Sequence, residues 1–317
     1  MPARIEHDAR VSIELSLRRL DHVAAALFPQ YSRSRLQQWI DSGELTVDGE
    51  NRKPKYKVSA GAMLRIAAQP ELSSNSPEAI ALDIVYEDAA VLVVNKAAGL
   101  VVHPGAGNQG GTLLNALLHH DADLEAVPRA GIVHRLDKDT TGLMVVAKTL
   151  SSQNRLVQQL QDRTVKRVYE AVTYGVIGQS GTVDAPIGRH SHNRTRMSIQ
   201  TGGREAITHY RPLRQFKHFS HLELSLETGR THQIRVHMQH LRHPLIGDPT
   251  YGGTFRQPPG QSNAELVDYV RSFPRQALHA RQLSFVHPDT GQAPSFTADL
   301  PDDMGRLLEL LLQHESS

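Results

Sequence analysis

The most informative stretch of the chain for chemistry runs from Gly131 to Gly142, Gly-Ile-Val-His-Arg-Leu-Asp-Lys-Asp-Thr-Thr-Gly. Its apolar residues are interleaved with side chains that can carry or transfer charge, namely His134, Arg135, Asp137, Lys138 and Asp139. The end of a purely structural strand needs few such groups, whereas a site that positions a carboxylate beside cations needs several. The stretch therefore predicts a reactive site, with a polar loop held by a salt bridge as the alternative.

Two other patterns look like ligand sites but lack the context that such sites require. Gly105-Ala-Gly-Asn-Gln-Gly110 fits G-x-G-x-x-G, yet no strand ending in an acidic residue follows about 20 positions later, so we expect a turn. His232, His237 and His240 have Arg235 among them, and a cation beside a metal ion is costly. We expect surface or phosphate-facing histidines there, no metal site and no cofactor.

Composition excludes several classes of protein. The 317 residues include 35 Lys+Arg and 33 Asp+Glu, a net charge of +2, so the chain is no polycation. The absence of cysteine excludes disulfides, iron–sulfur clusters, thiolate zinc sites and cysteine nucleophiles. The apolar run 89–94 is far shorter than the ~18 residues of a membrane span, and the first residues lack a signal-like segment. We expect a cytoplasmic protein without membrane contact.

The apolar spacing predicts two domains joined by a linker. Residues 1–70 read as a small unit with helices near 20–27 and 33–42 and strands near 45–47 and 63–66, and residues 71–80 have linker composition. A set of cations lies on the second helix and after the Asp48-Gly49 turn: Arg33, Arg35, Lys53, Lys55 and Lys57. Two helices feeding a basic β-hairpin favour RNA binding, with a merely solvated face as the alternative.

Residues 81–317 mix strands and helices. Strands are predicted at 91–94, 143–147, 165–174 and 222–226, and helices at 112–120, 151–161 and 234–241. The alternation of apolar Leu222, Leu224 and Leu226 with polar residues is typical of a half-buried strand. We therefore expect an α+β fold with a mixed, largely antiparallel sheet, preceded by a small N-terminal α/β RNA-binding domain.

Six segments in matching order resemble the RluA family of pseudouridine synthases. They are the central motif His134–Lys148, the first motif Val93–Pro104, the last motif Glu227–Met238, the tyrosine segment Lys166–Glu170, and the segments His243–Gly252 and Gln276–Ala280. The resemblance spans roughly residues 80–300. The N-terminal unit is similar to a small RNA-binding domain shared with a ribosomal small-subunit protein and tyrosyl-tRNA synthetases.

The resemblance implies the isomerisation of uridine to pseudouridine and assigns roles to residues. Asp137 is implied as the catalytic carboxylate, either as a nucleophile or as a base on the ribose, and the sequence does not choose between these roles. Arg235 matches the arginine that pairs with this aspartate, and Tyr169 matches the tyrosine that stacks on the uracil. Arg135 matches the residue that fills the gap left by the flipped base. Ile234 and His134 are expected to contact the substrate as well.

A second basic segment is expected to bind the RNA backbone. Residues 185–204 contain no acidic residue but include Arg189, Arg194 and Arg196. An acid-free run with several arginines is typical of phosphate contact, although a solvated loop is the alternative.

The N-terminal unit and the central motif together make the chain most similar to family members that modify 23S ribosomal RNA, at a stem-loop at the bridge between the ribosomal subunits. We expect 23S ribosomal RNA as the partner, free or within an assembling large subunit, and a monomeric enzyme. Two alternatives stay open: the same chemistry on another structured RNA such as tRNA, and a non-catalytic ribosome-assembly factor. Intact Asp137, Tyr169 and Arg235 argue against the second, because a pure binder needs no such set.

Overall fold

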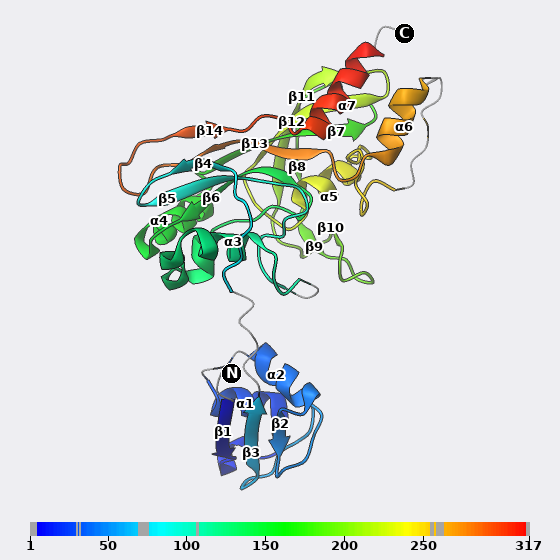
Figure 1. Ribbon diagram of the computed structural model, residues 1–317. Helices are drawn as coiled ribbons and strands as arrows, with labels where there is room; N and C mark the ends of the chain where they lie inside the picture. Colours follow the sequence, from blue (N-terminus) through cyan, green and yellow to red (C-terminus); the bar gives the residue numbers. More distant parts are fainter. Residues whose placement is uncertain are drawn as a thin grey trace. The chain divides into compact units, whose positions relative to one another are not determined.

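The computed structural model describes residues 5–29, 31, 33–68, 76–105, 108–253, 257 and 263–314. The chain forms two compact units, residues 1–74 and 75–317 (Figure 1). The predicted linker at 71–80 lies partly outside the described residues. Its later part has no helix or strand, and it is tied to the larger unit because the Asn115 side chain donates to the Ser76 carbonyl at 2.8 Å.

The smaller unit is a three-stranded antiparallel sheet packed against two helices. Its elements are β1 (Ile5–Arg10), η1 (Ile13–Leu15), α1 (Leu20–Leu27), α2 (Arg33–Ser42), β2 (Leu45–Val47) and β3 (Met63–Ala68), with sheet order β1-β3-β2. Both predicted helices are confirmed, and α2 buries Leu36, Trp39 and Ile40 as its spacing indicates. Strand β1 was not foreseen, because its alternation of polar residues reads as exposed chain.

The predicted hairpin forms, but its basic residues do not lie on strands. Asp48 and Gly49 form the turn with φ of 52° and 81°, and β2 pairs with β3. Lys53, Lys55 and Lys57 lie in the long connection between those strands, and all three are exposed. The cations thus follow the turn, as predicted, within the connection between the two paired strands. Pro54 lies in the same segment and cannot donate to a strand ladder.

The larger unit is built on a nine-stranded sheet in order β4-β5-β6-β13-β7-β12-β11-β8, with β14 on β13. Its strands are β4 (Ile84–Glu87), β5 (Val91–Lys96), β6 (Thr141–Ala147), β7 (Lys166–Tyr174), β8 (Gly181–Asp184), β11 (Ile207–Gln215), β12 (Phe219–Leu226), β13 (Leu278–Ser284) and β14 (Ser295–Thr297). A separate hairpin pairs β9 (Ile187–Arg189) with β10 (Met197–Ile199). Among the described ladders only β6 and β13 pair in parallel, which confirms the mixed, largely antiparallel sheet.

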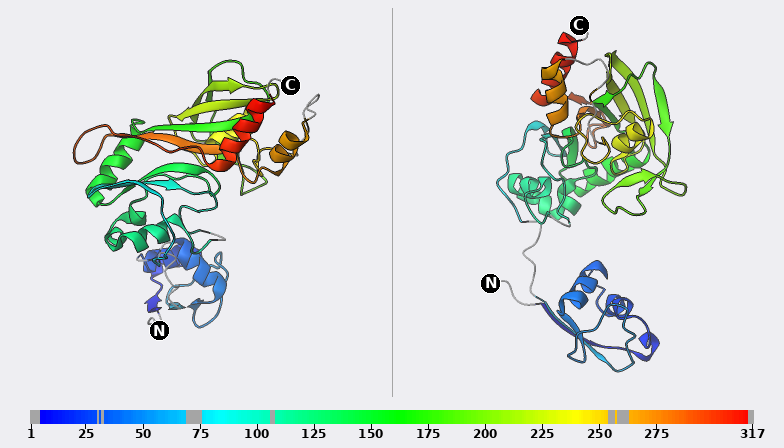
Figure 2. Two further views of the ribbon diagram at one scale, coloured as in Figure 1. Left: turned by 45° about the horizontal axis from the view of Figure 1, so that its top comes forward. Right: turned by 90° about the vertical axis from the view of Figure 1, so that its right-hand side faces the viewer.

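Helices cover both faces of this sheet. They are α3 (Leu113–His120), α4 (Leu150–Gln161), α5 (Gln233–His240), α6 (Ala264–Ser272) and α7 (Asp302–Gln313), with short segments η2 (Ala122–Ala126) and η3 (Pro128–Gly131). Apolar residues of α3 and α5 share one core with Leu92, Met144 and Leu224. The opposite face is covered by α4 and by α6 and α7, which lie side by side (Figures 1 and 2).

The segment that carries Asp137 leads directly into β6, a central strand of the larger sheet. Strand β6 is buried along its whole length, so the loop that enters it is held by the core. None of the described helices combines the length and the hydropathy that crossing a bilayer requires.

Candidate active site

A cleft of about 840 Å³ opens beside the N-terminal end of β6. It is lined by the loop 132–137, by β7, by the segment between β12 and α5, and by the start of α5. The structure brings together in it all six residues expected to be catalytic or substrate-binding: His134, Arg135, Asp137, Tyr169, Ile234 and Arg235. Asp137 and Arg235 lie 98 positions apart in the sequence, so the fold brings them together.

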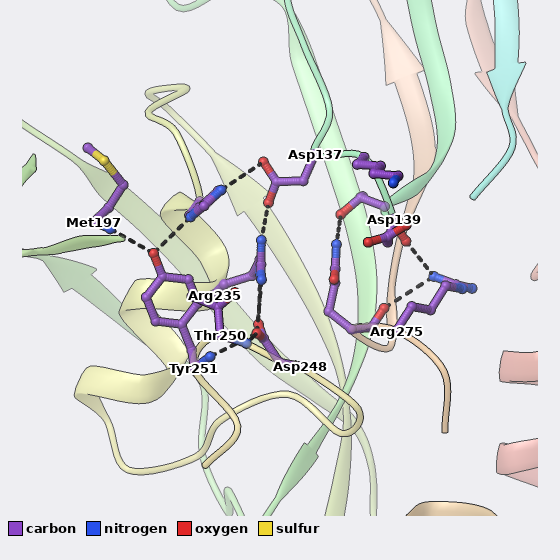
Figure 3. Close-up of polar contacts among 12 residues, drawn as sticks. Asp137, Asp139, Met197, Arg235, Asp248, Thr250, Tyr251 and Arg275 are labelled. Atoms are coloured by element: carbon purple, nitrogen blue, oxygen red, sulfur yellow. Dashed lines mark hydrogen bonds and ion pairs between the residues drawn. The ribbon is translucent and has the colours of Figure 1, made fainter. Parts of the chain in front are cut away.

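An arginine held between two carboxylates forms the centre of the cleft (Figure 3). Arg235 Nη1 donates to Asp137 Oδ2 at 2.9 Å, while its Nε and Nη2 donate to the two oxygens of Asp248 at 2.7 and 2.9 Å. The Asp248 side chain has no exposed surface, and that of Asp137 is 15% exposed. Burial alone would lower the pKa of Arg235, but Asp248 and Asp137 outweigh it and raise that pKa. The guanidinium is thus permanently charged and fixed against Asp137.

A tyrosine and a histidine complete this network. The Tyr251 ring lies under Arg235, 5.1 Å from the guanidinium carbon, and its hydroxyl accepts from the Met197 backbone N–H at 2.8 Å. The same hydroxyl is 2.8 Å from His232 Nδ1, and His232 Nε2 lies 3.9 Å from Asp137 Oδ1. Burial lowers the pKa of His232, so the ring is neutral at neutral pH. With Tyr251 donating to Nδ1, the Nε2–H of this ring faces Asp137.

The loop that carries Asp137 is pinned on both of its sides. Lys96 Nζ donates to the carbonyls of Ala97, Leu100 and Lys138 at 2.7, 2.9 and 2.8 Å. Arg275 donates to the Asp139 carbonyl at 3.2 Å (Figure 3), and Gln276 donates to the Thr140 hydroxyl at 2.9 Å. Burial lowers the pKa of Lys96 to about 8. These contacts fix the direction in which Asp137 leaves the sheet.

Two apolar residues form walls of the cleft. Tyr169 on β7 is 5% exposed, and burial raises the pKa of its hydroxyl. Ile234 on the first turn of α5 is 4% exposed. Both belong to the same core cluster as Leu136, the residue before Asp137, so one packed core positions the walls and the carboxylate.

Arg135 and His134 differ in their surroundings. Arg135 is exposed at the cleft and makes no hydrogen bond or ion pair with any residue that the structure describes. His134 Nε2 accepts from the Val145 backbone N–H of β6 at 3.1 Å. Burial, together with the charge of Arg167, lowers the pKa of His134 to about 3.

The arginines of the acid-free segment lie on the β9–β10 hairpin. Arg189 and Arg194 are exposed, whereas the Arg196 guanidinium lies over the Tyr251 ring at 5.3 Å. The hairpin is therefore joined to the network around Asp137 through Tyr251, which also holds Met197 of β10.

In the smaller unit, the predicted cations differ in their contacts and exposure. Arg33 donates to the buried Asp21 carboxylate at 2.8 Å, and the Arg35 guanidinium lies 5.8 Å from the Trp39 ring. Lys53, Lys55 and Lys57 are exposed.

The expectation of surface or phosphate-facing histidines near α5 is corrected by the structure. His237 is fully buried and lies between the Thr208 hydroxyl and the Ala185 carbonyl, at 2.9 and 3.0 Å. His232 belongs to the Asp137 network, and only His240 is exposed. No group of three or more His, Asp or Glu able to hold a metal occurs in the part of the chain that the structure describes.

Sequence reasoning missed several residues that the site uses. Asp248, Tyr251, Lys96 and Arg275 hold Arg235 or the Asp137 loop. Asp248, Tyr251 and Lys96 lie within segments that matched the family, so their presence there was a usable signal. Arg167 also lines the cleft and lies in the matched tyrosine segment, whereas Arg275 lies just outside the matched segments.

Comparisons with known proteins agree with this geometry. The RNA pseudouridylate synthase family model matches residues 90–240 and the S4 domain model residues 18–64. "Ribosomal large subunit pseudouridine synthase D" of Pseudomonas aeruginosa is 55% identical to this chain, and the match covers 99% of this chain and 98% of the relative. The protein of the same name from Escherichia coli O6:H1 is 51% identical, and the match covers 98% of this chain and 96% of the relative. Among solved structures, human RNA pseudouridylate synthase domain containing 4 has a TM-score of 0.55 and 25% identity, over 72% of this chain and 92% of that one. With this identity over nearly its full length, the chain belongs to the RluA family of RNA pseudouridine synthases.

Proposed function

We propose that this enzyme converts uridine to pseudouridine in 23S ribosomal RNA, at a stem-loop at the bridge between the subunits. The names of its full-length relatives, which refer to the ribosomal large subunit, support this substrate. The single observation that carries the chemistry is the Asp137 carboxylate held 2.9 Å from a buried Arg235 in the cleft.

Asp137 is the catalytic carboxylate in this proposal. The N1–C1′ bond of the uridine breaks, the uracil turns, and a C5–C1′ bond forms. Asp137 either attacks as a nucleophile or removes a proton from the ribose, and its Oδ1, which does not accept the Arg235 hydrogen bond, is available for either role. Arg235 keeps the carboxylate charged and oriented, and Tyr169 stacks on the base.

The target uridine must leave its stack to reach this cleft. Asp137 and Tyr169 are too deeply set for a base within a helix, so the nucleotide is flipped at a cost of a few kcal/mol. Arg135, exposed and without a protein partner among the described residues, enters the gap. Its planar guanidinium can both stack and donate, which lysine does less well. His134 of the central motif and Ile234 of the last motif also line the substrate site.

Two basic surfaces bind the RNA backbone. One comprises Arg189, Arg194 and Arg196 on the β9–β10 hairpin, and the other comprises Arg33, Arg35, Lys53, Lys55 and Lys57 of residues 1–70. The S4 match supports RNA binding by the smaller unit, and residues 81–317 form the catalytic domain after the linker 71–80. The enzyme acts as a monomer in the cytoplasm, on free RNA or on an assembling large subunit.

Tritium release from C5-labelled 23S ribosomal RNA tests this function. Wild-type enzyme should release tritium, and Asp137→Asn should release none while binding the RNA with nearly unchanged affinity. Turnover by Asp137→Asn would remove this residue from the mechanism. Release from labelled tRNA but not from 23S RNA would favour the same chemistry on another substrate. Binding without release from either RNA would favour a non-catalytic assembly factor.

A further inference from the structure

Several buried polar atoms in the active-site cleft have no protein partner. In the described part of the chain, six buried side-chain nitrogen atoms lack a hydrogen-bond partner, and three of them, His103 Nε2, His134 Nδ1 and Arg167 Nε, belong to residues that line this cleft. Buried polar groups are almost always satisfied. Three such atoms in one cleft make it a candidate site for a ligand that pairs with them.

The proton on His134 can be located from its contacts. Its Nε2 accepts the Val145 N–H at 3.1 Å, so that nitrogen carries no proton. Because burial lowers the pKa of this ring to about 3, the ring is neutral and holds a single proton. That proton must be on Nδ1. His134 therefore presents a buried N–H donor without an acceptor among the described residues.

Arg167 is a second buried group whose side-chain nitrogen lacks an acceptor among the described residues. It lies on β7, two residues before Tyr169 and on the same face of the strand, and it is only 8% exposed. No carboxylate, carbonyl or hydroxyl of the described residues accepts from it. Glu227 at the cleft is already engaged by Arg163 and His209, at 3.2 and 2.7 Å. Gly229 leaves room for the guanidinium, since a Cβ there would lie 2.7 Å from Arg167 Nη1.

Both donors line the same cleft as Tyr169. The charge of Arg167 acts on both rings, contributing to the lowered pKa of His134 and opposing the raised pKa of Tyr169. A buried guanidinium needs acceptors for its N–H groups, so Arg167 suits a ligand that supplies one.

We propose that Arg167 and His134 Nδ1–H form a donor pair for one carbonyl oxygen of the flipped uracil. This assignment rests on the function proposed above, in which the base stacks on Tyr169. The depth of the pair favours the base over a phosphate. Backbone phosphates stay near solvent, while a guanidinium more than nine-tenths buried suits a group that itself leaves water.

The donor pair has a chemical task. When the N1–C1′ bond breaks, its electron pair remains on the base, and the negative charge spreads over N1, O2 and O4. After rotation, C5 bonds to C1′, the C5 proton leaves to a base, and N1 gains a proton, so the isomerisation balances without a co-reactant. A buried cation and N–H at one carbonyl oxygen stabilise this charge as it develops.

Sulfur substitution in the substrate tests which atom the pair contacts. Target RNA carrying 2-thiouridine or 4-thiouridine replaces one carbonyl oxygen with a weaker acceptor. In wild-type enzyme, one of the two should slow the single-turnover rate by at least about tenfold. In Arg167→Met, the rate with unmodified RNA should fall by about 10²- to 10³-fold, and the additional effect of sulfur should disappear.

The control variants separate this contact from other roles. Arg211→Met removes a strand arginine that lies outside the cleft and pairs with Glu223, so it should leave the rate and the sulfur effects unchanged. Arg167→Lys retains the charge and tests the same coupling if Arg167→Met does not fold. His134→Phe, which removes the second donor, should lower the rate by a smaller factor than Arg167→Met.

Each other outcome overturns the proposal. Weaker RNA binding with a shallower salt dependence, at an unchanged single-turnover rate, would assign Arg167 to a phosphate. If sulfur slows wild type and Arg167→Met by the same factor, Arg167 acts through structure only. If neither sulfur substitution slows wild type, a contact at either carbonyl oxygen is excluded. Absence of wild-type turnover on unmodified 23S RNA would instead contradict the proposed function, and the uracil contact with it.

Discussion

The buried carboxylate of Asp248 is expected to control both stability and catalysis, although it does not face the substrate. It accepts two hydrogen bonds from Arg235, at 2.7 and 2.9 Å, and its Oδ1 also accepts the backbone N–H groups of Thr250 and Tyr251, at 2.8 and 2.9 Å. The side chain has no exposed surface. The substitution Asp248→Asn preserves its shape and removes its charge.

Neither orientation of the new amide can satisfy this site. With its oxygen in the place of Oδ1, the NH₂ group faces Arg235 Nε, donor against donor. In the flipped orientation, the NH₂ group faces Thr250 N–H, Tyr251 N–H and Arg235 Nη2. One charged hydrogen bond is worth about 1.5–3 kcal/mol. Because the buried guanidinium also loses half of its counter-charge, we expect the free energy of unfolding to fall by about 3–5 kcal/mol.

The same change should slow the reaction without abolishing it. Arg235 still reaches Asp137 but loses the paired hydrogen bonds that fix the orientation of its guanidinium. A displacement of a catalytic group by about 1 Å costs roughly 10²-fold in rate. Urea unfolding measures the stability, and single-turnover tritium release measures the chemical step. Asp268→Asn is the control, because that carboxylate is 70% exposed and its pair with Arg271 is worth at most about 1 kcal/mol. A loss of stability below about 1 kcal/mol together with a wild-type rate would refute the reasoning.

Three further predictions concern the surroundings of this network. Lys96→Met leaves three backbone carbonyls without their donor and should lower the free energy of unfolding by about 3 kcal/mol and the turnover rate as well, measured in the same two assays. The pKa of His134 is 6.5 in the unfolded chain but about 3 in the folded protein, so its contribution to stability is complete at neutral pH and is lost as the pH falls. Between pH 7 and 5, the free energy of unfolding of wild type, measured in urea, should therefore fall by about 2 kcal/mol more than that of His134→Phe. Combined replacement of Arg189, Arg194 and Arg196 by alanine should reduce the slope of log affinity against log salt by about 2, and an unchanged slope would show that they do not touch phosphate.

Local patterns were sufficient for most of the elements. The spacing of Leu36, Trp39 and Ile40 and the alternation around Leu224 depend on helix and strand periodicity, which acts over a few residues. The helices and strands predicted from them are confirmed, and the family motifs located the cleft. The strands predicted at 45–47 and 63–66 pair as β2 and β3, and the predicted cations lie in the irregular chain between them.

Burial of polar groups was not readable from the sequence in the same way. His237 lies in the polar company that indicates a surface position, yet it is fully buried because Thr208 and the Ala185 carbonyl satisfy both of its ring nitrogens. A polar side chain is buried wherever partners meet it, and those partners come from distant strands.

The sequence by itself determined the family and the reaction and predicted the carboxylate, because the residues that carry the resemblance stand in contiguous motifs that can be recognised without the fold. The tertiary structure decided what holds that carboxylate. Sheet order β6-β13-β7 and the return of the chain after α5 bring Arg235, Asp248 and Tyr251 to Asp137, and they leave Arg167 buried without a partner among the described residues. Helix and strand periodicity reflects residues that are close in the sequence. Charge pairing in a buried site depends instead on which distant segments pack together in the core.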